Sequence, residues 1–114
     1  MRDTRTWSDS GDERSDVLRR RARRLARQRD FRKASIALRE LVAHKQDAAS
    51  WVALGDMLVR ARRNAEALQA LRQGLWLHRR AGAAGRARTV ARMIVALDPT
   101  DEKAARFADL PCAA

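Results

Sequence analysis

Apolar side chains recur along this chain at intervals of three and four residues, which is the spacing of one face of an α-helix. The first clear stripe runs through Leu18, Ala22 and Leu25, and arginine fills most of the positions between them. Short polar breaks separate the stripes, and several breaks carry a residue suited to cap a helix N-terminus. The pattern predicts a series of helices joined by short turns.

The stripes and breaks predict five helices and a short sixth one. The helices are expected to begin at or beside these residues: Ser15 or Asp16, Asp30, Asp47, Asn64, Arg86 and Thr100. Asp98-Pro99 ends the fifth helix, because the residue before a proline avoids helical backbone angles. Trp76 is grouped with the inward-facing residues of the fourth helix. Connections this short force neighbouring helices to lie antiparallel.

These limits divide the chain of 114 residues into three parts. Residues 1–14 are polar and are predicted to be a disordered tail, residues 15–110 form the helical domain, and residues 111–114 form a flexible end. No apolar run approaches the roughly 20 residues that span a bilayer, and the N-terminal residues are too polar for a secretory signal. We therefore expect no membrane insertion and a cytoplasmic protein.

A motif in the middle of the chain resembles a known family of helical repeats. Residues 51–58 read Trp-Val-Ala-Leu-Gly-Asp-Met-Leu, and Ala67, Leu71 and Gly74 follow. This arrangement resembles the tetratricopeptide repeat (TPR) family, in which each repeat of about 34 residues is a pair of helices. Large side chains fill the space between the two helices, and small ones let the backbones approach. Ala34 precedes Ala67 by 33 residues, close to the length of one repeat. The segment around Ala34 therefore resembles a second copy of the repeat upstream.

The resemblance covers about residues 15–110 and is weaker at both ends. Arg21 stands where the first unit would usually carry leucine, and the third unit lacks a second Trp-x-x-Leu-Gly, so its register stays open. The resemblance implies an all-α fold of antiparallel helix pairs stacked as a short TPR-like solenoid, with about five helices plus a short C-terminal capping helix. A generic bundle of four to six helices is the alternative. Self-association is also open, because three units are the lower limit for a stable solenoid.

The resemblance also implies a binding role, since the first helix of each pair in this family lines a concave face that holds peptides. By motif position the lining residues would be Arg19, Arg23 and Arg27 in the first unit, and Val52, Asp56, Val59 and Arg60 in the second. The family's clamp for C-terminal carboxylates needs asparagines where this chain has Arg23 and Ala53, so we do not expect that clamp. The expected partner is another protein or peptide, with an acidic segment as one candidate.

Charge points to a second class of partner. The formal net charge is +11, and nearly all of the 25 basic residues are arginine. Residues 17–33 contain many basic residues and a single acidic one, Asp30. Because a guanidinium pairs with two oxygens at once, nucleic acid is the alternative partner, although the scarcity of aromatic residues disfavours single-strand binding. A solvated helix face and the arginine bias of a GC-rich genome would produce the same pattern.

The chain shows no arrangement of residues typical of an enzyme. His44 and His78 lie far apart, and neither has a ligand at metal-binding spacing, so each is expected at the surface or at a loop edge. No glycine-rich phosphate loop, nucleophile elbow or metallopeptidase motif occurs. Cys112 is the only cysteine, which favours a reducing compartment. We therefore expect a non-catalytic protein without a metal or a cofactor.

Overall fold

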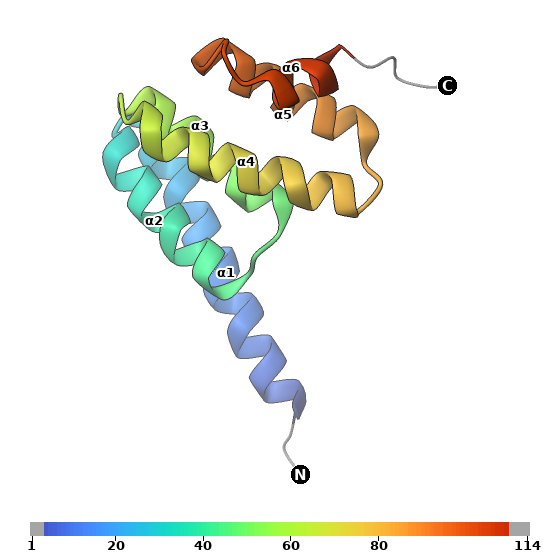
Figure 1. Ribbon diagram of the computed structural model, residues 1–114. Coiled ribbons are helices and arrows are strands. Elements are labelled where there is room, and N and C mark those ends of the chain that lie inside the picture. Colours follow the sequence, from blue (N-terminus) through green and yellow to red (C-terminus); the bar gives the residue numbers. More distant parts are fainter. Residues whose placement is uncertain (1–3, 110–114) are drawn as a thin grey trace.

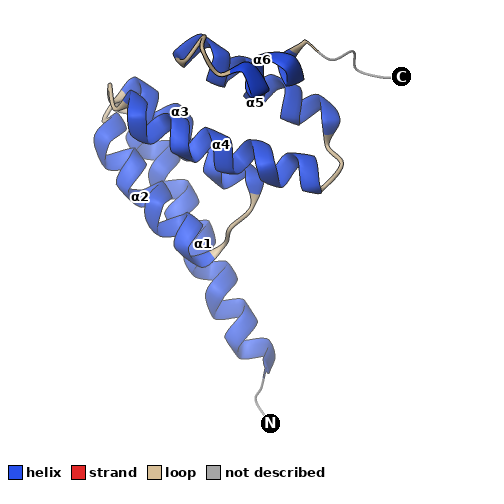
Figure 2. Cartoon of the chain, viewed as in Figure 1, coloured by secondary structure: helices blue, strands red, loops and turns tan. Residues whose placement is uncertain are grey.

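The computed structural model describes residues 4–109, and every regular element in that range is an α-helix (Figures 1 and 2). The helices are α1 (Thr4–Arg27), α2 (Phe31–His44), α3 (Ala48–Arg60), α4 (Asn64–Arg80), α5 (Ala84–Leu97) and α6 (Glu102–Ala108). Each helix packs against the next one along the chain. The prediction of a helical chain with short connections is confirmed.

The N-terminal caps follow the sequence in part. The carboxylates of Asp30 and Asp47 each accept the backbone N–H three residues later, at 3.2 and 2.7 Å, as expected for α2 and α3. The cap of α6 is Asp101 and not Thr100, whose hydroxyl donates to Asp98. Asn64 is the first residue of α4 and not its cap, and that helix begins without a capping side chain.

The first helix begins earlier than the apolar pattern indicated. α1 starts at Thr4 and not near Ser15, so the helix includes most of the segment that was expected to be a disordered tail. That segment lacks an apolar stripe, but extending an existing helix needs only one further backbone bond for each residue. In Figure 1 this part of α1 projects beyond the other helices. The expected flexible end, residues 111–114 with Cys112, lies outside the described residues.

α3 and α4 approach closely at two glycines. A Cβ atom added to Gly55 would lie 2.6 Å from Leu71 Cδ2, and one added to Gly74 would lie 2.7 Å from Val52 Cγ2. The two contacts run in opposite order along the two helices, so α3 and α4 are antiparallel. The two segments that carry the TPR-like motif are therefore adjacent packed helices, as the sequence predicted.

The core consists of large aliphatic side chains set beside very small ones. The largest fully buried side chains are Leu41, Leu58, Leu71 and Ile94, and the alanines without exposed surface are Ala34, Ala67, Ala87 and Ala91. Burial of each large aliphatic side chain contributes about 1.5–3 kcal/mol. Trp76 was expected to face inward and is 49% exposed. The buried stripe of α4 continues instead through Gly74 and His78, which places Trp76 on the far side of the helix.

The turns after α1, α3 and α4 share one hydrogen-bonding pattern. In each turn, two consecutive backbone N–H groups reach back to carbonyls in the last turn of the helix, at 2.8 to 3.0 Å. The residue with left-handed backbone angles is Arg29 (φ 62°) after α1, Arg62 (φ 65°) after α3 and Gly82 (φ 73°) after α4. Glycine adopts these angles freely, whereas a residue with a side chain does so at a cost of about 1 kcal/mol or more.

We expect Gly55→Ala and Gly74→Ala each to destabilise the fold. Overpacking of a filled core costs about 1–3 kcal/mol, and the better helix propensity of alanine returns up to about 1 kcal/mol. The net loss should be about 0.5–2 kcal/mol in urea unfolding. Gly85→Ala is the matched control, because nothing lies within 4 Å of its added Cβ. Equal stability of all three variants would contradict the close packing of α3 on α4.

Candidate functional site

Two adjoining cavities form a groove across α1, α3 and α5. The first has a volume of about 430 Å³ and is lined by residues of α1, α2 and α3. The second has a volume of about 650 Å³ and is lined mainly by residues of α3 and α5. Ala49 and Ala53 of α3 line both cavities. The two cavities therefore adjoin at these small side chains of α3.

The walls of the groove come from one face of each of the three helices. α1 contributes Arg19, Ala22, Arg23 and Ala26, α3 contributes Ala49, Val52, Ala53, Asp56 and Met57, and α5 contributes Arg86, Thr89, Val90 and Met93. The steps of three and four residues place each set on one side of its helix. Behind them, Leu38 and Leu41 of α2 are buried and form an apolar floor.

The structure brings four of the seven sequence-predicted site residues to this groove. Arg19 and Arg23 line the first cavity, and Val52 and Asp56 line the second. Arg27 is exposed at the end of α1 and lines neither cavity. On α1, the predicted binding face therefore reaches the groove at Arg19 and Arg23 but not at Arg27.

The two remaining predicted residues lie at the end of α3. Val59 is half-buried and packs against the core. Arg60 donates from Nε to Asp56 Oδ1 at 3.2 Å, and its guanidinium carbon lies 5.5 Å from the centre of the Phe31 ring. The contact with Phe31 holds Arg60 over the start of α2. Neither residue lines the groove.

Sequence reasoning missed the α5 wall of the groove. Arg86, Thr89, Val90 and Met93 were not assigned, because the register of the third unit stayed open. α4 has 17 residues where α2 has 14, so the step to the third unit is longer than the step between the first two. The glycine break at residues 82–85 was the signal for this longer step, since Gly82 has left-handed backbone angles in the turn that ends α4.

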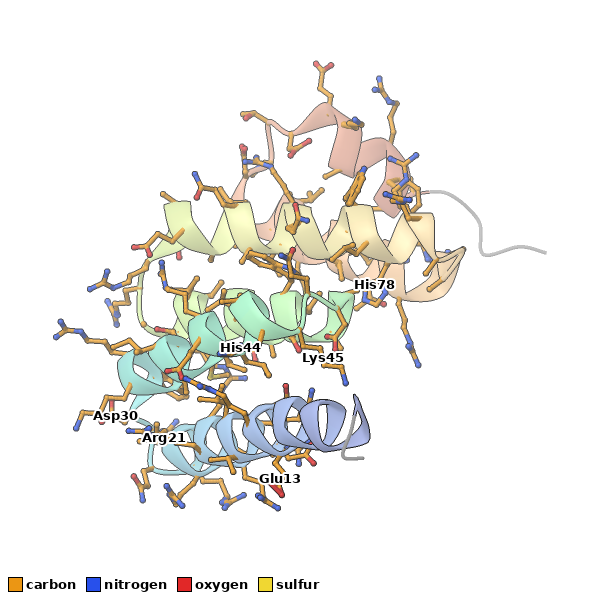
Figure 3. The ribbon with its side chains drawn as sticks, turned by 90° about the horizontal axis from the view of Figure 1, so that it is seen from below. Glu13, Arg21, Asp30, His44, Lys45 and His78 are labelled. Carbon is orange, nitrogen blue, oxygen red and sulfur yellow. The ribbon has the colours of Figure 1, made fainter. Side chains whose placement is uncertain are left out.

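His78 was expected at the surface, but it is buried on α4 with only 8% of its surface exposed. It lines the second cavity together with Arg86 (Figure 3 labels His78). Burial lowers the pKa of the imidazole because the charged form loses its hydration, and the nearby positive charge of Arg86 lowers this pKa further. A neutral imidazole therefore lies at the base of the groove near neutral pH.

The polar groups that line the groove are largely engaged in local structure. Asp47 caps α3, and Asp56 accepts from Arg60. The Thr89 hydroxyl donates to the Gly85 carbonyl at 3.2 Å. Arg23 and Arg86, by contrast, have no carboxylate within ion-pair distance among the described side chains of residues 13–109. These two arginines are the charged groups in the groove that are open to a ligand.

Several carboxylates form ion pairs with arginines that lie outside the groove. Glu66 of α4 binds Arg39 of α2 and Arg63, and these hydrogen bonds lower the pKa of the Glu66 carboxyl. The backbone N–H of Ala104 lowers the pKa of Asp101, and Arg72 adds to this effect. The contacts join α2 to α4 and α4 to the start of α6. At exposed positions such pairs add little to stability, because solvent screens the charges.

We expect acid to destabilise the fold through His78 before the carboxylates titrate. The folded-state pKa lies below the unfolded value of about 6.5, so the stabilisation is complete above that pH and is lost as the pH falls below it. Urea unfolding of the wild type should show a falling free energy between pH 7.5 and about 5, and His78→Gln should show a smaller fall. An identical fall in both proteins would contradict this role.

The groove is the described feature best suited to a ligand. Within the part of the chain that the structure covers, no three His, Cys, Asp or Glu side chains are grouped to hold a metal ion. None of the described helices has the length and hydropathy needed to cross a bilayer. No family model, curated protein or solved structure matches the chain.

Proposed function

We propose that this protein is a non-catalytic, TPR-like binding module that holds a peptide segment of a partner protein in the groove across α1, α3 and α5. The observation that carries the proposal is that the two cavities adjoin at Ala49 and Ala53 of α3. A groove that crosses three helices is long enough for a peptide segment and not only for a small molecule.

The order of the helices supports the TPR-like architecture. The groove is walled by alternate helices, while α2 and α4 stand behind and supply Leu38, Leu41 and His78. Stacked helix pairs produce such a face, since the first helix of every pair falls on the same side of the stack. The turns at Arg29 and Arg62 repeat with the same backbone geometry 33 residues apart. That spacing matches one repeat of the family.

The chemistry of the groove describes the peptide that it would take. The floor and much of the walls are aliphatic, and cavities of several hundred cubic ångströms suit buried apolar side chains. Arg23 on one wall and Arg86 on the other provide unpaired positive charges. We infer a segment that places apolar side chains in the two cavities and acidic side chains beside these arginines.

The engagement of the polar lining supports a binding role over a catalytic one. Asp47, Asp56 and the Thr89 hydroxyl each already serve the local structure. A nucleophile needs a base within hydrogen-bonding reach, and the groove supplies no such pair among the described residues. We therefore infer that the groove binds a peptide segment and does not catalyse a reaction.

We expect Ala49→Glu to abolish most peptide binding. Ala49 is exposed and lines both cavities, so a larger anionic side chain there would obstruct the groove and repel an acidic segment. Peptides selected from a displayed random library on the wild-type protein should bind this variant at least about tenfold more weakly, which is about 1.4 kcal/mol. Fluorescence anisotropy with labelled peptides measures the change.

Ala65→Glu is the matched control for this experiment. Ala65 is also an exposed alanine at the second position of its helix, but it lies on α4 and lines neither cavity of the groove. It should leave the affinity unchanged. Failure to enrich any peptide, or equal weakening by both substitutions, would contradict the groove as the binding site.

A further inference from the structure

A second surface, separate from the groove, lies where the turn between α1 and α2 meets the turn between α3 and α4. A cavity of about 440 Å³ is lined by residues 28–32 of the first turn and by Arg60 and Ala61 of the second. In Figure 3, Asp30 marks this end of the molecule. Arg29 and Arg32 line this cavity, and Arg27 and Arg62 are exposed residues next to its lining in the sequence. We call the four arginines Arg27, Arg29, Arg32 and Arg62 the basic edge.

The cations of the basic edge are unpaired. Among the side chains that the structure describes, those of residues 13–109, no carboxylate lies within ion-pair distance of any of the four. The nearest acidic residues in sequence are already engaged, since Asp30 caps α2 and pairs with Lys33 at 3.8 Å. Glu66 similarly pairs with Arg39 and Arg63. Like charges gathered without partners repel one another and attract an anion.

Backbone conformation singles out two of these arginines. Arg29 and Arg62 occupy the left-handed position of their turns, with φ of 62° and 65°, although glycine adopts that conformation at lower cost. The turn after α4 has Gly82 at the same position. Stability alone would favour glycine at all three turns. The two turns that carry arginine are the two that meet at this edge, so a requirement for charge explains the difference.

We propose that the basic edge binds the phosphate backbone of a nucleic acid. A partner protein would bury apolar side chains at the core of its interface, and a helix that inserts into a lipid surface would do the same. The edge offers little of that kind, because the guanidinium of Arg60 covers the Phe31 ring. A polyanion needs only cations and the release of its counterions. Guanidinium groups fit phosphate oxygens closely, and the absence of a free aromatic ring here implies binding without base recognition.

The decisive variant is the double substitution Arg29→Gly and Arg62→Gly. It removes two charges from the edge and places glycine where the backbone favours it, so the variant should melt at the same temperature as the wild type or higher. Binding of a fluorescein-labelled DNA duplex, measured by anisotropy at about 50 mM salt, should weaken at least tenfold. The slope of log K against log salt should fall by about 2 in magnitude, one for each lost phosphate contact.

The double substitution Arg92→Gln and Arg106→Gln is the control of equal charge. Both residues are exposed on α5 and α6, so this variant lowers the net charge equally without touching the edge. It should bind duplex almost as tightly as the wild type. The proposal is overturned if both double variants lose affinity equally, if the wild type binds no DNA at low salt, or if poly-glutamate binds as tightly as the duplex.

Discussion

The close approach of α3 and α4 is the contact on which the rest of the structure depends. At Gly55 and Gly74 the partner side chains Leu71 and Val52 occupy the space that a Cβ atom would need. With α4 held this near, α3 lies between α1 on one side and α5 on the other and can wall both cavities. Gly55 and Gly74 are therefore required because they lack a side chain. Gly82 is favoured for a different reason, because its backbone has left-handed angles. The groove is a consequence of this packing.

The periodicity of apolar residues was sufficient to predict α2 to α6 and the second half of α1, because local spacing and local caps encode much of a helix, but it missed the first half of α1. Asp30 and Asp47 cap their helices as expected. The position of the α5 wall could not be read in the same way, since it depends on the length of α4 and on three-dimensional stacking. His78 shows the limit most clearly. A histidine has no apolar signature, yet it lies on the stripe that continues through Leu71 and Gly74 and is buried with them.

The distribution of charge could not be predicted from composition either. The chain has a formal net charge of +11, but the groove combines three arginines with two aspartates and an aliphatic floor. Of the described arginines of α1, only Arg19 and Arg23 line its two cavities. Several carboxylates are paired elsewhere, with Arg39, Arg63 and Arg72. A segment that looks uniformly basic in the sequence therefore divides into a groove wall at Arg19 and Arg23 and a separate edge that begins at Arg27.

The two proposed surfaces use different parts of the same helix pairs. The groove is formed by the sides of α1, α3 and α5, whereas the basic edge is formed by the turns that close the first two pairs. Because helix sides and turns face in different directions, a ligand on one surface would leave the other accessible. The Asp56–Arg60 contact is the one described link between them, since Asp56 lines the groove and Arg60 lines the cavity at the edge. A module built in this way would bring a peptide and a phosphate backbone together through separate contacts, and each affinity would then depend on its own residues.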